Sequence, residues 1–225
     1  MQPIWMKQNS LVGSIKYLLG VLIIGIGIGL LVSLISSLFV FFVKWFIEAR
    51  SISINDFLKF PETELSLMPM FWLLLAAVLL VCVRRVFNID RWHGPADSIY
   101  AAHRTDNELD LKAGFGSTLA AFISLCGGAP VGQYGPLVHF GATVSSFIRK
   151  QSFIPKIPHD IIIGSGVAAA ISAGFGAPIA GIIFAHETVL RHFSMKAVAA
   201  LAISSMAANF FAKEIGIVNP PLLLS

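Results

Sequence analysis

Residues 127–136 read Gly-Gly-Ala-Pro-Val-Gly-Gln-Tyr-Gly-Pro and interrupt a stretch, residues 113–147, that contains no Asp, Glu, Lys or Arg. Residues 161–185 are equally free of charge and are interrupted by Gly-Phe-Gly-Ala-Pro at 174–178. Proline and glycine at this density end helices. Non-helical backbone persists at membrane depth only where protein buries it or a water-filled cavity solvates it. The sequence therefore predicts two broken membrane helices, and such breaks mark the binding sites of transporters.

The composition indicates an all-α integral membrane protein. Of the 225 residues, 56% are hydrophobic and only 12% are charged, whereas soluble domains carry about 25% charged residues. Uncharged runs also cover residues 17–43, 65–83 and 197–212. At roughly 20 apolar residues per crossing, the chain holds about five to seven membrane segments. We expect residues 1–225 to form a single membrane domain with no soluble domain.

The charge pattern predicts an orientation in the membrane. The net charge of +4 is interpreted as the usual excess of basic residues that orients a membrane protein, and no nucleic-acid partner is expected. This bias puts the N-terminus and residues 84–112 in the cytoplasm and the acidic residues 44–64 outside. Cys82 and Cys126 lie in apolar runs, where each thiol packs as a small hydrophobic group and no disulfide is expected.

The segment 132–136 is the best candidate for an anion site. It opens an apolar helix expected over residues 137–148, with Pro136 at a first helical position. A helix N-terminus inside the membrane presents unpaired N–H groups and about half a positive charge, which attract anions. A second turn of this kind, residues 93–98, precedes a helix expected over 99–103. The alternatives are an ordinary helix–helix corner and a cytoplasmic connector, respectively.

Other polar residues give weaker signals. His186 and Glu187 do not complete a zinc motif, because the next histidine, His192, is six residues on and would lie on the opposite face of a helix. Neither a metal nor any cofactor is expected. Glu187 either lines a vestibule or lies at a helix end by the water interface. The chain has no nucleophile elbow, phosphate-binding loop or paired catalytic carboxylates, so it is not predicted to be an enzyme.

Two of these segments resemble the CLC family of chloride channels and proton/chloride antiporters. Residues 132–136 (Gly-Gln-Tyr-Gly-Pro) resemble its G-R-E-G-P motif, and residues 175–187 resemble its F-N-A-P-L-A-G-x-L-F-x-x-E segment. Gly94 and Pro95 occupy, more weakly, the place of its G-S-G-I-P turn. The resemblance covers roughly residues 15–215. It implies a homodimer with one pore per subunit, residues 180–212 near the interface, and an anion site fed by helix N-termini. The anion-binding residues so implied are Gly94, Pro95, Gly132, Tyr134, Gly135, Pro136 and Leu137.

Three departures from the family pattern carry chemical meaning. Tyr134 stands where the family has its gating and proton-carrying glutamate, and Thr188 stands where the antiporters have an inner proton-transfer glutamate. A phenol is uncharged at pH 7 but can donate a hydrogen bond to an anion. Pro95 replaces a serine that donates its hydroxyl to the anion, and proline there accompanies a preference for nitrate. The resemblance thus implies passive, proton-uncoupled transport of chloride or nitrate, without control by voltage or ligand.

The resemblance extends to only the first of the family's two inverted halves. The second half's G-x-F-x-P motif is missing, since Gly176 stands where that motif has phenylalanine. Half a site leaves polar helix ends that lipid cannot satisfy, so a second copy or a separately encoded half-chain is expected to cover them. The alternative is a non-transporting half-subunit or truncated fragment that needs a second chain. We expect the protein to be multi-pass, in a bacterial inner membrane.

Overall fold

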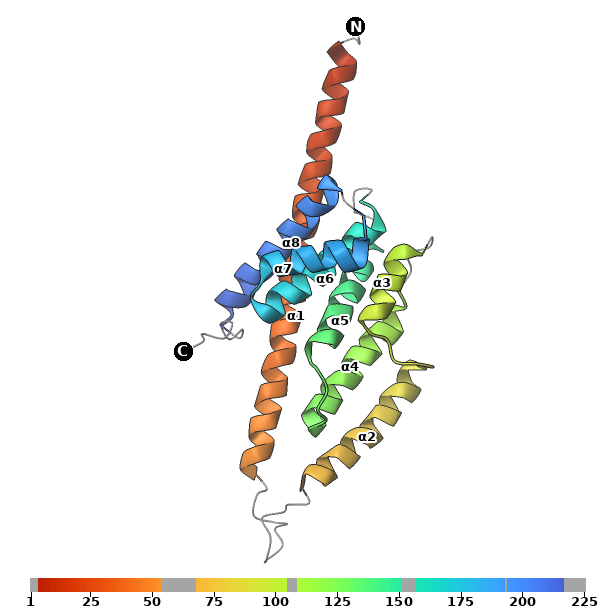
Figure 1. The fold of residues 1–225 in the computed structure, drawn as a ribbon, viewed down its shortest axis with the longest axis vertical. Coiled ribbons are helices and arrows are strands. Elements are labelled where there is room, and N and C mark those ends of the chain that lie inside the picture. Colours follow the sequence, from red (N-terminus) through yellow and green to blue (C-terminus); the bar gives the residue numbers. More distant parts are fainter. Residues whose placement is uncertain (1–3, 54–67, 105–108, 151–156, 193, 217–225) are drawn as a thin grey trace, which may run out of the picture.

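The computed structural model describes residues 4–53, 68–104, 109–150, 157–192 and 194–216, and all regular structure in these ranges is helical. The predicted all-α fold is therefore confirmed for the described part of the chain. Figure 1 shows the helices in chain order. They are α1 (Ile4–Ser53), α2 (Met68–Phe87), α3 (Pro95–His103), α4 (Leu111–Gly127), α5 (Tyr134–Arg149), α6 (His159–Phe175), α7 (Pro178–Phe184), the π-helix η1 (Ala185–Leu190) and α8 (Met195–Glu214).

Helix α1 is longer than its uncharged run. Its 50 residues extend about 75 Å at 1.5 Å per residue, and its N-terminal turns project beyond the other helices (Figure 1). Residues 44–53 were predicted to begin an external loop, and this was wrong, because they continue α1. Lysine, glutamate and arginine in this part have long unbranched side chains that favour a helix in water as well as in lipid. The predicted loop's remaining residues, 54–64, lie outside the described part.

Among the described residues, three helices are long and apolar enough to cross a membrane, namely Ile15–Arg50, Met68–Phe87 and Met195–Glu214. Helix α2 runs back in the direction opposite to α1 (Figure 1). Leu111–Gly127, His159–Phe175 and Pro178–Leu190 are shorter apolar helices. These shorter elements come from the two segments that the sequence predicts to be broken.

Both predicted breaks are present. Helix α4 ends at Gly127 and α5 begins at Tyr134, while α6 ends at Phe175 and α7 begins at Pro178. Gly128 and Gly176 end α4 and α6 in the left-handed conformation, with φ of 91° and 65°. Glycine adopts this conformation without steric cost, and it lets the N–H after the helix bond back to the last turn.

Some predicted boundaries need correction. Helix α5 begins at Tyr134 and not at Leu137, so Pro136 is its third residue and not its first. Helix α3 begins at Pro95, four residues before the predicted start. Proline fits anywhere in a first turn because the N–H groups there have no partner within the helix. His192 lies beyond η1, which ends at Leu190 with Arg191 left-handed. The prediction that His186 and His192 lie on opposite faces of one helix is therefore wrong.

Helix α6 is the centre of the packing. It contacts α1, α3, α5, α7, η1 and α8, and its side chains between Ile161 and Ala173 are buried. It crosses α5 where Gly166 meets Gly141, so closely that a methyl group on either glycine would overlap the other's backbone. Gly25 and Gly29 of α1 likewise lie against α8. Small residues therefore bring the helices into backbone contact, which is typical of helices that pack in lipid.

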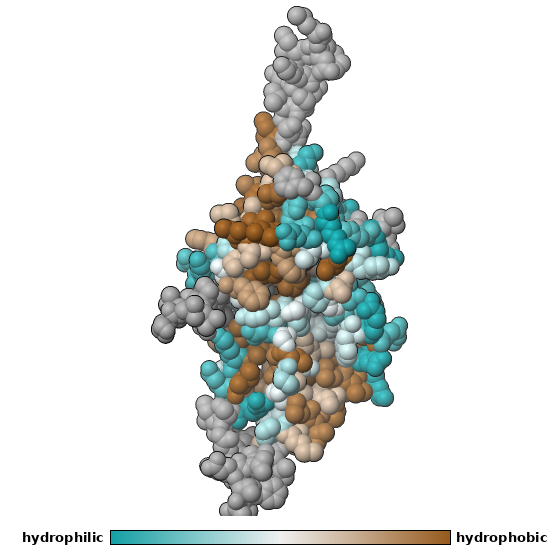
Figure 2. Space-filling model, in the orientation of Figure 1, coloured by the Kyte–Doolittle hydropathy of each residue, from teal (hydrophilic) through white to brown (hydrophobic). Residues whose placement is uncertain are grey.

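The outer surface is largely apolar, as lipid requires. On the face drawn in Figure 2, hydrophobic residues cover most of the upper left and much of the lower part, while hydrophilic residues gather along the right-hand edge, on the side of α3. Large apolar side chains are well exposed on α2 and α8, for example Val78 at 61% and Phe210 at 66%. Water would disfavour such exposure, whereas a bilayer does not.

The contact between α5 and α6 gives a first prediction. Replacing Gly166 with alanine places a methyl group against the Gly141 carbonyl, and such overpacking costs about 1–3 kcal/mol. We expect the melting temperature of the protein in detergent to fall clearly in G166A.

The matched control is G27A on α1, because a methyl group there has nothing within 4 Å. G27A should melt like the unaltered protein. Equal melting temperatures for G166A and G27A would contradict the packing described.

Candidate functional site

Residues from three interrupted parts of the chain meet at the start of α5. Gly135 faces the start of α3, where a Cβ atom on Gly135 would lie 3.8 Å from Cγ of Pro95. The Tyr134 ring lies on the Phe175 ring at the end of α6, with centroids 4.1 Å apart and planes inclined by 31°. A Cβ atom on Gly174 would lie 2.9 Å from Cδ1 of Tyr134. The predicted residues Pro95, Tyr134 and Gly135 are therefore neighbours, with Phe175 as an additional member.

The start of α5 has no side-chain cap. The residue before it, Gln133, makes no capping hydrogen bond. At the start of α4, by contrast, the Asp110 carboxylate accepts from the N–H groups of Lys112 and Ala113, at 2.9 and 3.2 Å. The first N–H groups of a helix have no partner within it, so those at the start of α5 are available to a ligand. Together they carry a partial positive charge of about half an electron.

Exposure changes steeply along this segment. Gly132 is exposed, Tyr134, Gly135 and Pro136 are half-buried, and Leu137 is only 1% exposed. Pro136 has no N–H to offer, so the donors in the first turn are those of its neighbours. An anion at the surface of this turn would meet backbone donors on one side and the Tyr134 ring beside them.

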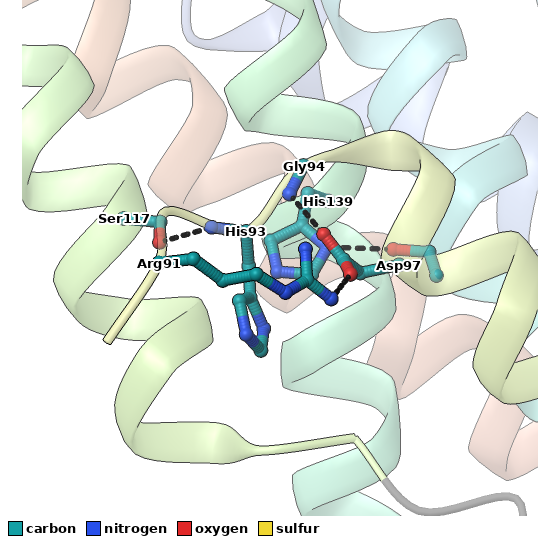
Figure 3. A network of polar contacts seen from close by, with 7 residues as sticks. Arg91, His93, Gly94, Asp97, Ser117 and His139 are labelled. Carbon is teal, nitrogen blue, oxygen red and sulfur yellow. Dashed lines mark hydrogen bonds and ion pairs between the residues drawn. The ribbon is translucent and has the colours of Figure 1, made fainter. Parts of the chain in front are cut away.

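The start of α3 is arranged differently. The Asp97 carboxylate accepts from the Gly94 N–H at 2.8 Å and pairs with the exposed guanidinium of Arg91, as Figure 3 shows. Asp97 lies in the connecting stretch 84–112, outside the candidate spans. Burial raises the pKa of its carboxyl, but the bonds from Arg91 and Gly94 and the nearby His93 outweigh this and leave the pKa below its usual value. The Gly94 amide is thus engaged by a side chain.

A histidine pair lies beside this turn (Figure 3). His139 of α5 is 1% exposed, and its Nδ1 lies 2.7 Å from the Ser98 hydroxyl of α3. Its ring centroid is 5.9 Å from that of His93, whose backbone N–H donates to the Ser117 hydroxyl of α4 at 2.8 Å. These contacts fasten α3 to α4 and α5. Spacing along the sequence does not reveal this cluster, because its members are up to 46 residues apart.

Two predicted positions lie away from Tyr134. Thr188 and Glu187 belong to η1, about ten residues along a helix from Pro178, which corresponds to about 15 Å. The Thr188 hydroxyl donates to the Phe184 carbonyl, and the Glu187 side chain is exposed. The structure therefore does not bring these residues to the start of α5.

The histidines near α7 form no metal centre in the described ranges, where no group of three His, Cys, Asp or Glu side chains lies close enough to hold an ion. His192 instead lies beside α6, with its Nε2 3.6 Å from the Asp160 carboxylate.

A family model described as "Voltage gated chloride channel" matches residues 73–223 of the chain. The chain belongs to this family. The matched range contains α3, α5 and both breaks between helices, α4 to α5 and α6 to α7. The family resemblance of the motifs is therefore confirmed. Family proteins of this description are transport proteins, in agreement with the prediction that the chain is not an enzyme.

Individual family members are distant from the chain. The voltage-gated ClC-type chloride channel ClcB of Salmonella typhimurium (strain LT2) is 30% identical over 135 residues, which are 60% of this chain and 32% of ClcB. ClcB of Escherichia coli (strain K12 / DH10B) is 29% identical over 134 residues, again 60% and 32%. The crystal structure of a slow cyanobacterial Cl⁻/H⁺ antiporter matches with a TM-score of 0.66 and 20% identity, over 87% of this chain and 47% of the antiporter.

The chain thus spans about a third of the length of the curated relatives it matches and about half of the antiporter. At 20% identity the structural match shows a shared fold. Its extent fits the prediction that the chain resembles one half of a CLC subunit.

The histidine cluster gives a second prediction. Replacing Ser98 with alanine removes the partner of a fully buried ring nitrogen, and an unsatisfied buried polar group costs about 1–3 kcal/mol. We expect S98A to be less stable by this amount, as measured by unfolding with increasing SDS in mixed micelles.

The control is T118V, because the buried Thr118 hydroxyl bonds within its own helix, to the Gly114 carbonyl, and valine has the same shape. A loss of stability in T118V as large as that in S98A would show that the contact between α3 and α5 adds no particular stability.

Proposed function

We propose that the chain is an anion-transport unit in which chloride or nitrate binds to the uncapped first turn of α5, with Tyr134 as gate or hydrogen-bond donor. The observation that supports this most is the meeting of the α5 start with Pro95 and Phe175, which places free backbone donors beside a neutral phenol at a break between membrane helices. Family membership supports the transport of an anion. The residues proposed to bind it are Gly132, Tyr134, Gly135, Pro136 and Leu137, with Gly94 and Pro95 as the opposite wall.

The two walls have different roles in this proposal. Backbone donors with about half a positive charge hold an anion weakly enough for it to leave again, whereas an unpaired lysine or arginine would hold it more firmly. At α3 the Asp97 carboxylate already occupies the Gly94 donor and would repel a second negative charge. The α3 start therefore contributes the apolar ring of Pro95, and α5 contributes the attraction.

We further propose that transport is passive and not coupled to protons, and that neither voltage nor a ligand controls it. A tyrosine and a threonine occupy the two positions at which the antiporters of the CLC family carry titratable glutamates, as the motif resemblance implies. Phenol and alkyl hydroxyl groups do not ordinarily exchange protons near pH 7, so these residue types favour uncoupled transport. The cyanobacterial relative is described as a Cl⁻/H⁺ antiporter, so this is the point at which the chain is proposed to differ. Glu187, exposed on η1, is proposed to line the inner vestibule.

A second candidate function is that of a half-subunit that transports only with a second chain. It is favoured by the exposure of the proposed site, since Gly132 is exposed and Tyr134 only half-buried. Polar helix ends need cover in lipid. We propose that a second copy or a separate half-chain supplies this cover, with α7 and α8 near the subunit interface. We also propose that the protein lies in the inner membrane with its N-terminus in the cytoplasm.

The central experiment measures efflux of chloride and nitrate from liposomes that contain the 225-residue chain, together with the proton movement. We expect anion efflux driven by its gradient and no accompanying proton flux. Anion efflux with protons moving in the opposite direction at a fixed ratio would contradict uncoupled transport. Efflux that appears only after a second half-chain is added would establish the half-subunit instead.

Tyr134 gives a third prediction. In Y134E a carboxylate replaces the phenol beside the free N–H groups of α5 and competes with the anion, so we expect efflux at pH 7 to fall about tenfold. Efflux should recover as the pH is lowered far enough to protonate the introduced carboxyl, because the neutral acid no longer competes with the anion.

Y134F is the matched control, because it keeps the ring on Phe175 and adds no charge. It should show no recovery in acid. A Y134E variant with the efflux and pH profile of Y134F would exclude Tyr134 from the anion path.

Pro95 gives a fourth prediction, on selectivity. In P95S a hydroxyl donor returns to the wall opposite Gly135, and a hydrogen bond to a charged group is worth about 1.5–3 kcal/mol. We expect the chloride-to-nitrate permeability ratio, measured from reversal potentials or competing efflux, to rise about tenfold. P95A is the control, because it removes the proline ring without adding a hydroxyl; an equal change in P95A would show that the hydroxyl is not responsible.

A further inference from the structure

An apolar groove follows α4 on the side of α1 and α2. Its outer part has a volume of about 170 Å³ and lies between the end of α1 and the start of α2. A cavity of about 150 Å³ with apolar walls suffices to bind benzene. The lining residues that matter here are Phe46, Trp72, Ala76, Phe122 and Cys126. We call this the α2–α4 groove.

A second hollow lies beside the first along α4. A second apolar pocket of about 320 Å³ shares Phe122 with the first and reaches Phe115. Between Phe115 and Gly127 the axis of α4 rises about 18 Å, and one leaflet of a bilayer has a hydrocarbon depth of about 15 Å. The α2–α4 groove is therefore long enough for an acyl chain across one leaflet.

The outer end of the groove carries a positive charge. Arg50, half-buried near the end of α1, lies at the end of α4 with its Nη1 3.4 Å from the Cys126 carbonyl oxygen. A guanidinium has five N–H donors, and the bond to the Cys126 carbonyl uses one of them, so others can bond an anionic group. Phosphate oxygens match the fork of the guanidinium.

A second donor lies in the wall. The indole Nε1 of Trp72 is buried and has no hydrogen-bond partner in the described part of the chain. A buried donor without a hydrogen bond costs free energy. The Trp72 ring packs edge-on against Phe46, 5.7 Å away, and Trp45 is exposed on the same turn of α1. Aromatic residues gather in this way at the level of lipid headgroups.

We infer that the α2–α4 groove binds an anionic phospholipid, with one acyl chain along α4, the phosphate at Arg50 and a headgroup or ester oxygen accepting from Trp72. The apolar walls, the length of one leaflet, the cation at one end and the unmatched indole donor together fit this class of ligand. Free phosphate would leave the apolar walls unfilled, and a neutral lipid would leave Arg50 without a net negative partner. The inference does not depend on which anion the protein transports.

The test uses the fluorescence of a single tryptophan in the full chain. In W5F/W45F/W92F only Trp72 remains, and in W5F/W72F/W92F only Trp45 remains. Each variant is placed in phosphatidylcholine vesicles that contain a small fraction of either brominated phosphatidylglycerol or brominated phosphatidylcholine, both of which quench on contact. We expect Trp72 to be half-quenched at about fivefold less phosphatidylglycerol than phosphatidylcholine, the effect of one basic residue on an anionic lipid.

Trp45 is the matched control, because it is 56% exposed and does not line the groove. It should be quenched equally by both lipids. Adding R50Q to the Trp72 variant should abolish the headgroup preference, whereas K44Q, which removes an exposed cation from the same end of α1, should leave it unchanged.

Three results would overturn the inference. Equal quenching of Trp72 by both lipids would mean that Arg50 only caps α4. A preference that persists in R50Q would place the anionic lipid elsewhere. Trp72 quenched by neither lipid would mean that another part of the protein covers the groove. Each result is obtained without measuring transport, so it is distinguishable from a failure of the proposed function.

Discussion

A backbone N–H in the hydrocarbon of a membrane must find an acceptor, and this constraint governs the fold around α5. Residues 128–133 are not helical, so α5 begins inside an apolar segment with an uncapped first turn. The elements around that turn are fixed by other contacts: α6 touches α5 through paired glycines, and Ser98 ties α3 to His139. Close packing thus holds the interrupted ends together and leaves the first turn of α5 without a side-chain cap, where we propose that a small anion binds.

The sequence features that predicted the fold best act on the backbone close to where they occur. Charge-free runs and clusters of glycine and proline located the membrane segments and both breaks, because their effect on the backbone does not depend on distant residues. Boundaries were less well predicted. Proline is tolerated throughout a first turn, so Pro136 did not define where α5 begins, and the charged residues 44–53 continue α1, since a helix need not end at the membrane surface.

The candidate site could be predicted only in part. Pro95, Tyr134 and Gly135 were named from their motifs, but the Phe175 ring beside Tyr134 and the engagement of Gly94 by Asp97 depend on how α3, α5 and α6 pack. The histidine pair gave no sequence signal, because side chains that meet across helices have no fixed spacing along the chain. The same holds for the α2–α4 groove, which residues of four helices line.

The central claim is that an anion rests against the first backbone N–H groups of α5 beside Tyr134. Diffraction from crystals grown in bromide tests it most directly, because bromide replaces chloride and is located by its anomalous scattering. The account predicts a peak at hydrogen-bonding distance from the amides of Gly135 or Leu137, next to the tyrosine ring. A protein whose α5 start carries no bromide, while bromide binds at Arg91 or at another cation, would contradict it.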